Sequence, residues 1–257
     1  NRESFGPLTA TLVSPCITIV IQLCEMLLSL EEGVKSFSVS FSQTGSMIQD
    51  IVTANVLRKM AKHYAEQIGC GDAMINLVYH QWMGAFPSNK DFSESLINTS
   101  TVIASMVRAD KIITKTRDEA FGIPTRESNA KTVANTQYTL RMLQGIPNIT
   151  DEQEEEIVTS EVMSIMEAVF NDKADTLWRK VFNSIKSGII DVPYSPHIIN
   201  HNEVVTVRDK NKNIRIIKKG NLPISDRCFE YEKAQCDLNK DASSIVNDII
   251  HDIGIMQ

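Results

Sequence analysis

A lysine and a glutamate four residues apart are the side chains of this sequence whose types and spacing best suit ligand binding. Lys115 lies at the end of a run, 111–116, that is expected to form a strand, and Glu119 follows four residues later. An ammonium group donates hydrogen bonds and a carboxylate accepts them from hydroxyls, so the pair suits a ribose. The spacing equally allows a plain ion pair, and both interpretations stay open at this point.

A second loop rich in functional side chains follows the preceding predicted strand, residues 73–79. It carries His80, Gln81, Trp82, Met83 and Phe86. Taken alone, an aromatic loop of this kind is either a ligand platform or packing. In a parallel α/β fold the loops that leave the carboxyl ends of the strands form the active site, so both loops are candidates for it.

Other common functional motifs are missing from the sequence. It contains no glycine-rich nucleotide loop, no HExxH, no GxSxG and no corrinoid-binding DxHxxG; the nearest approach to the last, DIIHDIG at 248–254, is one residue too long and predicts a helix. The five cysteines form no CxxC pair, which argues against a zinc site and a disulfide framework. A reducing cytoplasm is the expected location.

Composition indicates an ordinary globular protein. The chain has 257 residues, of which 42% are hydrophobic and 23% charged, with a formal net charge of -6. This acidic balance argues against nucleic-acid binding, and the short basic cluster at 210–219 predicts a solvated hairpin. Polar residues interrupt the most apolar stretch, 12–30, so we predict no membrane span.

Two predicted parts position these residues. Residues 1–145 alternate strands with helices, as parallel strands with helical crossovers do, and four such units make half of a (β/α)8 barrel or a small open sheet. The predicted strand and helix pairs are 8–13 with a helix from Pro15 to near Gly33, 34–42 with 47–68, 73–79 with 92–107, and 111–116 with 126–143. Ser14 and Thr125 are the expected caps of the first and fourth helices.

The second predicted strand carries an alternation of serine with apolar residues. Its serines are Ser36, Ser38, Ser40 and Ser42. They face water if the sheet is half exposed, or a barrel lumen if both faces are covered. A parallel strand is usually covered on both faces, so we favour the lumen.

Residues 146–257 are expected to form a helical extension with a β-hairpin. A capping box at 150–153 predicts a helical segment that continues to about 186 with a break near Asn171. Residues 204–208 and 214–217 have a hairpin pattern around a polar turn, and further helices are predicted from Asp226 and Ala242.

Several of these residues together resemble one known family. The blocks are FGPLTATL at 5–12, MIQD at 47–50, HQWMG at 80–84, KT at 115–116 with EA at 119–120, GIPT at 122–125 and GNLP at 220–223. In order and spacing they are similar to the carboxyl-terminal half of the large (epsilon) subunit of glutamate mutase, also called methylaspartate mutase. The resemblance covers nearly the whole chain.

The resemblance implies strands 5–8 of a TIM barrel and a role in an adenosylcobalamin-dependent isomerase. In that family a radical rearrangement converts (S)-glutamate into (2S,3S)-3-methylaspartate, and a separate small subunit holds the corrinoid. The chain starts at Asn1 and runs into strand-like sequence, so we expect a preceding segment. An amino-terminal half-barrel, or a chain supplying it, is therefore an expected partner, and this chain alone is expected to be inactive.

The resemblance also implies roles for single residues. Lys115 and Glu119 match the pair that binds the adenosyl ribose, and Phe86 and Ile123 match corrinoid or adenosyl contacts, with His80 and Met83 as second choices. No catalytic residue and no metal ligand is assigned, because the family's substrate-binding arginines lie on the first four strands. Ser40 and Ser42 stand where a glycine-rich strand end is typical, which reduces the volume of the expected cavity.

Two alternatives belong to other functional classes. The chain is then either a non-catalytic remnant or assembly protein of the same family, or part of an enzyme of another barrel family without cobalamin. Binding of adenosylcobalamin by the reassembled protein separates both alternatives from the mutase.

Overall fold

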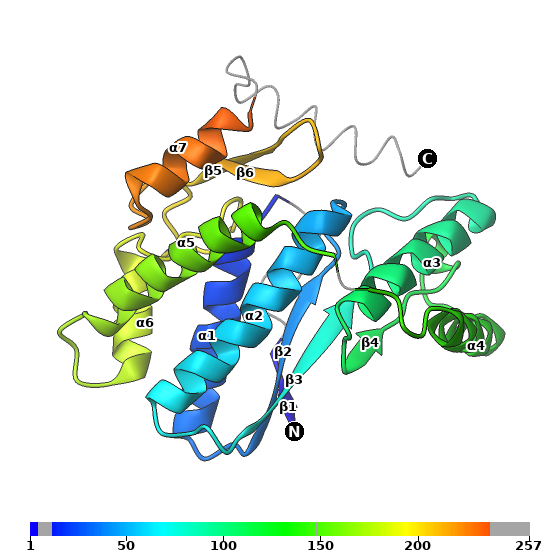
Figure 1. The fold of residues 1–257 in the computed structure, drawn as a ribbon, viewed down its shortest axis with the longest axis horizontal. Helices are drawn as coiled ribbons and strands as arrows, with labels where there is room; N and C mark the ends of the chain where they lie inside the picture. The colour runs from blue at the N-terminus through cyan, green and yellow to red at the C-terminus, as the bar shows by residue number, and fades with distance from the viewer. Residues whose placement is uncertain (5–11, 148, 237–257) are drawn as a thin grey trace.

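A curled parallel sheet of four strands forms the centre of the computed structural model, which describes residues 1–4, 12–147 and 149–236. The strand order is β1-β2-β3-β4, as expected for successive βα units (Figure 1). The strands are β1 (Arg2–Glu3), β2 (Ser36–Ser42), β3 (Met74–His80) and β4 (Lys111–Ile113). This arrangement is consistent with half of a (β/α)8 barrel.

Helices alternate with the strands as predicted. The helices of this part are α1 (Pro15–Glu31), α2 (Met47–Gln67), α3 (Lys90–Met106) and α4 (Arg126–Met142). Thr125 caps α4 by accepting a hydrogen bond from the Ser128 amide at 3.1 Å, and Ser14 with Pro15 begins α1. Both predicted caps are confirmed, although the Ser14 side chain makes no capping hydrogen bond.

The first strand differs from the prediction. Residues 8–11 of the predicted strand 8–13 lie outside the described residues, and Leu12 and Val13 are not in a strand. The structure instead pairs Arg2 with Phe37 and Glu3 with Ser38. The neighbouring strand β2 also bonds to α1, because the Ser40 amide donates to Gln22 Oε1 at 2.8 Å.

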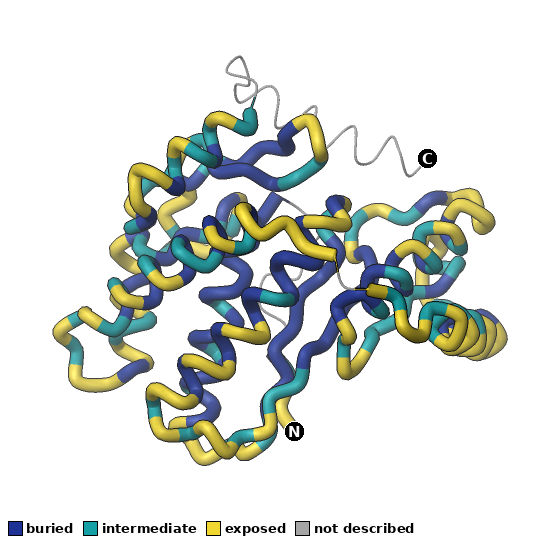
Figure 2. Tube along the Cα trace, in the orientation of Figure 1, coloured by how far each residue is buried: buried dark blue, intermediate teal, exposed yellow. Residues whose placement is uncertain are grey.

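The hydrophobic core lies between the sheet and its helices. Phe37, Val39 and Phe41 of β2 are buried against α1 and α2. Helix α1 is buried on nearly all sides because α5 and α6 cover the side that faces away from the sheet. Figure 2 shows the same concentration of buried residues along α1 and β2, whereas α4 is mostly exposed. Each large apolar side chain that is fully buried contributes about 1.5–3 kcal/mol.

The serines of β2 lie on the concave face of the sheet. Successive strand residues point to opposite faces, so Ser38, Ser40 and Ser42 face away from the helices. All three are nevertheless buried. The structure therefore supports the lumen interpretation and contradicts the solvent one.

The remaining elements pack on the outside of this half-barrel. They are α5 (Glu152–Phe170), α6 (Leu177–Lys186), β5 (Val205–Arg208), β6 (Ile214–Lys218) and α7 (Asp226–Ala234). The predicted break at Asn171 is confirmed as the end of α5, and β5 and β6 form the predicted antiparallel hairpin. The helix expected from Ala242 lies outside the described residues.

Two details of this extension were predicted wrongly. The cap of α5 is Asp151, which accepts from the Glu154 amide at 3.0 Å, and not Thr150. The basic cluster at 210–219 is not wholly solvated, because Arg215 is only 2% exposed. It is enclosed between α5 and α7, whose carboxylates bind it.

No helix within residues 1–4, 12–147 and 149–236 combines the length and hydrophobicity needed to cross a bilayer.

Candidate functional site

Two hydrogen bonds join the carboxyl ends of β3 and β4. The Lys115 backbone amide donates to the side-chain oxygen of Gln81, Oε1, at 2.8 Å. The Gln81 backbone amide donates to the Ile113 carbonyl at 3.2 Å. Strand β4 ends at Ile113, three residues earlier than predicted. Lys115 is therefore a loop residue held against the end of β3.

Lys115 and Glu119 form the predicted pair. Lys115 Nζ lies 3.5 Å from Glu119 Oε2, and the two side chains are 23% and 25% exposed. The other carboxylate oxygen, Oε1, accepts from the Thr116 amide at 3.3 Å. The ion pair is long and partly exposed, so both groups keep hydrogen-bonding capacity for a ligand. A donor beside an acceptor is the arrangement that two neighbouring ribose hydroxyls need.

The glutamine next to this pair is fully buried. Gln81 Nε2 donates to the Ile97 carbonyl at 3.2 Å and to Thr101 Oγ1 at 3.1 Å, both on α3. The sequence placed Gln81 in a candidate loop but gave it no role. Its one signal was its position directly after a strand, where an amide has both a donor and an acceptor to offer.

The tryptophan of the same loop serves packing. Trp82 is 4% exposed, and its Nε1 donates to the Ala85 carbonyl at 2.9 Å. A Cβ at Gly84 would lie 2.8 Å from the indole, so the backbone approaches the ring closely. Met83 is 38% exposed and Phe86 is half-buried. For Trp82 the packing interpretation is correct, whereas Met83 and Phe86 remain accessible.

Ile123 is 98% exposed in the loop before α4. It lines a groove of about 490 Å³ together with Phe121 and the Lys90–Asp118 ion pair, whose charged atoms are 2.9 Å apart. Neither Lys115 nor Glu119 lines that groove. The structure therefore brings Lys115 and Glu119 together, but it gives Ile123 a surface of its own.

A second polar cluster lies on the concave face of the sheet. Glu3 of β1 accepts from His80 Nε2 at 3.1 Å and from Lys111 Nζ at 2.7 Å. The small serines of β2 leave room for these side chains to meet between the two edge strands. Burial lowers the pKa of His80, and the Glu3 carboxylate opposes that shift. Glu3 was not predicted as a site residue, because it lies before the predicted first strand.

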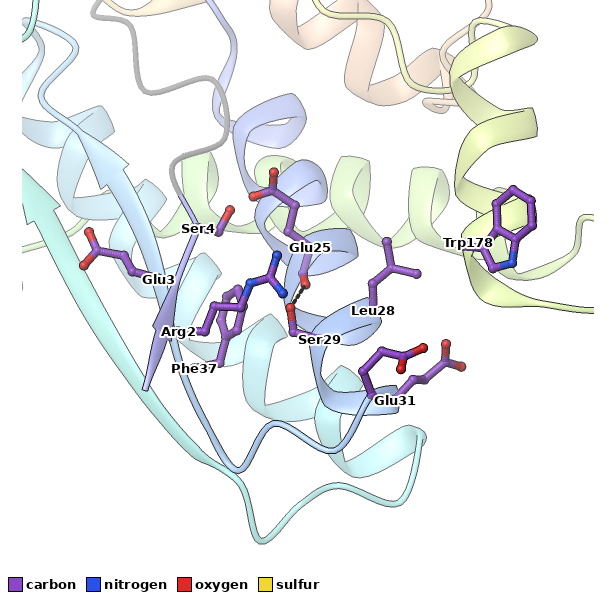
Figure 3. Close-up of a pocket in the computed structure, with 10 residues that line it drawn as sticks. Arg2, Glu3, Ser4, Glu25, Leu28, Ser29, Glu31, Phe37 and Trp178 are labelled. Carbon is purple, nitrogen blue, oxygen red and sulfur yellow. Dashed lines mark hydrogen bonds between the residues drawn. The ribbon is translucent and has the colours of Figure 1, made fainter.

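Another groove, of about 570 Å³, lies at the β1 edge of the sheet. Figure 3 shows it between β1, α1 and Trp178 of α6, with Arg2 and Glu3 pointing to opposite sides of β1. It contains none of the predicted site residues. The described residues also contain no group of three or more His, Cys, Asp or Glu side chains placed to hold a metal ion.

Comparison with known proteins identifies the family. The sequence profile of the methylaspartate mutase E chain matches residues 1–244. The chain belongs to the methylaspartate mutase E chain family. This is the family that the sequence blocks resemble.

Similar proteins from several organisms are glutamate mutase epsilon subunits. The glutamate mutase epsilon subunit of Treponema denticola is 36% identical over 239 residues, which are 91% of this chain and 49% of that protein. The glutamate mutase epsilon subunit of Escherichia coli O157:H7 is 35% identical over 260 residues, 98% of this chain and 54% of that protein. The glutamate mutase epsilon subunit of Haloarcula marismortui is 31% identical over 237 residues, which are 91% of this chain and 48% of that protein. The chain thus spans about half the length of these curated relatives.

Proposed function

We propose that this chain is part of an adenosylcobalamin-dependent glutamate mutase, which interconverts (S)-glutamate and (2S,3S)-3-methylaspartate. Its membership in the methylaspartate mutase E chain family supports the reaction class. The observation that carries the proposal is the Lys115–Glu119 pair at the carboxyl end of β4, where a donor and an acceptor stand side by side. The five cysteines, which form no CxxC pair, fit a cytoplasmic enzyme.

The residues of this chain bind and orient the cofactor in this proposal. Lys115 donates to a ribose hydroxyl and Glu119 accepts from a ribose hydroxyl, while Phe86 and Ile123 contact the corrinoid or the adenosyl group. Adenosylcobalamin, when bound, supplies the radical that starts the rearrangement. No catalytic residue is assigned to this half of the protein.

The proposed assembly has two further parts. The four strands are strands 5–8 of the barrel, and an amino-terminal half-barrel supplies strands 1–4 and the residues that hold glutamate. A small cobalamin-binding subunit docks at the carboxyl ends of the strands. Exposed apolar side chains near those ends suit such a docking face: Met47, Ile48, Met83, Phe92, Phe121 and Ile123.

The test is cofactor affinity in the assembled enzyme, with the complete E chain and its small subunit. Replacing both Lys115 and Glu119 by alanine should weaken adenosylcobalamin binding by roughly 1–3 kcal/mol, because two hydrogen bonds in a partly buried site are lost. Arg227→Ala is the control, since this exposed side chain lies on α7. Unchanged affinity in the double variant would contradict the site assignment, and no binding by the unmodified assembly would favour a non-catalytic remnant.

A further inference from the structure

We propose that Gln81 is the positioning residue of the Lys115–Glu119 pair and fixes this pair relative to helix α3. The inference rests on the proposed function, because it assigns Gln81 a role in adenosyl recognition. Gln81 itself is fully buried and does not reach the ligand. It acts through the backbone of Lys115.

The hydrogen bonds of Gln81 define one orientation of its amide. The Lys115 amide is a donor only, so it requires the Gln81 oxygen at 2.8 Å. The Ile97 carbonyl is an acceptor only, so it requires the Gln81 nitrogen at 3.2 Å. Thr101 Oγ1 donates to that carbonyl at 2.9 Å and can therefore only accept from Gln81 Nε2, at 3.1 Å. An inverted amide would lose all three bonds.

This network determines the geometry of the ligand pair. Lys115 begins the loop segment 115–119, which ends at Glu119. The position of the Lys115 backbone determines where its side chain, and therefore its ammonium group, can lie. The following amide, of Thr116, donates to Glu119 Oε1 at 3.3 Å, and Thr116 Oγ1 accepts from the Asp118 amide at 3.2 Å. A shift of the Lys115 backbone consequently moves both the ammonium group and the carboxylate. Ångström-sized displacements of binding groups are enough to reduce affinity.

A purely structural role is the competing explanation. A buried glutamine with three satisfied hydrogen bonds also stabilises the fold, and its loss costs stability whether or not the cofactor depends on it. The two roles differ in what they predict for different cobalamins. A positioning role affects only ligands that carry the adenosyl group, whereas a fold defect affects every cobalamin.

The decisive experiment uses Gln81→Met, which keeps the side-chain length but removes all three hydrogen bonds. In the assembled mutase, adenosylcobalamin and methylcobalamin are titrated separately by absorbance. We expect adenosylcobalamin affinity to fall about tenfold, roughly one hydrogen bond in value, and methylcobalamin affinity to change by less than about twofold. In a background of Lys115→Ala with Glu119→Ala, Gln81→Met should have no further effect on either cobalamin.

Gln43→Met is the matched control. Gln43 is also buried, follows the neighbouring strand β2, and accepts from Ser100 on α3. Within the described residues no hydrogen bond joins the Gln43 side chain to Lys115 or Glu119. Gln43→Met should therefore leave the ratio of the two affinities unchanged. Thr101→Val provides a second variant if Gln81→Met does not fold, because it removes one acceptor of the Gln81 amide. It should lower adenosylcobalamin affinity selectively, about two- to threefold.

Three results would overturn the proposal. If Gln81→Met lowers the affinity for both cobalamins equally, Gln81 has only a structural role. If it lowers neither affinity, Gln81 does not influence the site. A full Gln81→Met effect in the background without Lys115 and Glu119 would show that it acts through other residues. If Lys115→Ala with Glu119→Ala itself leaves adenosylcobalamin binding intact, the proposed function fails first, and that outcome is distinct from the others.

Discussion

The buried carboxylate of Asp50 is expected to make the stability of this protein depend on pH. Asp50, in the first turn of α2, accepts from the amide and the hydroxyl of Thr44 at 2.9 and 2.6 Å. Within the part of the chain that the structure describes, its second carboxylate oxygen has no hydrogen-bond partner. Burial raises the pKa of Asp50 to about 7, against the hydrogen bonds from Thr44 and the charge of Arg208. Protonated Asp50 is therefore the stable form below neutral pH.

Asp50→Asn should change how stability depends on pH. Folding raises the pKa of Asp50 from 3.8 to about 7. Between about pH 4 and 7 Asp50 is therefore protonated in the folded state and ionised in the unfolded state. The free energy of unfolding of the parent protein consequently falls across this window. The asparagine variant lacks that loss, so its stability relative to the parent should rise by about 2 kcal/mol from pH 5 to pH 7.

Urea unfolding at a series of pH values measures this difference, and the other titrating groups cancel between the two proteins. Asp110→Asn is a useful control, since Asp110 also accepts a hydrogen bond from a backbone amide, that of Leu77 at 2.7 Å, but lies at an exposed position. A pH-independent difference between parent and Asp50→Asn would mean that Asp50 is ionised in the folded protein throughout.

The sequence predicted the side-chain pairing in the candidate site that is local. Lys115 and Glu119 are four residues apart in one loop, so their pairing needs no knowledge of the rest of the fold. Gln81 was given no role and Glu3 was missed, because their partners are remote in the sequence. Gln81 binds residues 16 and 20 positions away, and Glu3 binds Lys111 across 108. Such contacts depend on the curl of the sheet, which no spacing rule encodes.

The hairpin of β5 and β6 is attached to the half-barrel by a buried ionic cluster. Arg215 of β6 bonds to Glu154 on α5 at 2.8 Å, to Asp209 at 2.9 Å and to Glu232 on α7 at 3.3 Å. All four side chains are at most 4% exposed. The Arg215 guanidinium is thus the shared partner of three carboxylates. Burial raises the pKa of one of them, Glu232. The position of the hairpin depends on this cation.

Arg215→Leu should therefore be strongly destabilising. It leaves three buried carboxylates without their cation, and breaking a buried ion pair from one side costs about 3–5 kcal/mol. Arg227→Ala is the matched control, because Arg227 is paired with Glu156 at 2.8 Å but the side chains are 74% and 60% exposed. Its removal should cost less than about 1 kcal/mol. The free energy of unfolding in urea compares the two, and equal costs would contradict a structural role for the cluster.

Element boundaries were predictable where a local signal was unambiguous. The alternating serines, the Ser14–Pro15 start and the Thr125 cap each point to one structure, and they agree with it. The start of α5 was shifted because Thr150 and Asp151 are both good caps, and side-chain geometry selects Asp151. The basic cluster was misread because charge spacing does not reveal that Arg215 meets a carboxylate 61 residues away.

The whole molecule has a sheet with two open edges. Within the described residues β1 pairs only with β2, and β4 pairs only with β3. Apolar side chains remain exposed near both edges, with Trp178 at 54% beside β1 and Val133 at 58% beside β4. Open strand edges with apolar surroundings are sites where another chain adds. An amino-terminal half-barrel would cover both edges at once.

Residues 1–257 produced alone should therefore self-associate. Light scattering after size-exclusion chromatography should give a mass above that of one chain, 28.8 kDa. Co-production with the amino-terminal half of a relative's epsilon subunit should replace the self-associated species by a complex of one copy each, because the same edges are then occupied. Val133→Lys supplies the control: Val133 is 58% exposed beside β4, so a charge there should reduce self-association without entering the core. A monomer that unfolds cooperatively on its own would contradict the half-barrel interpretation, since it would mean that the two edges need no partner.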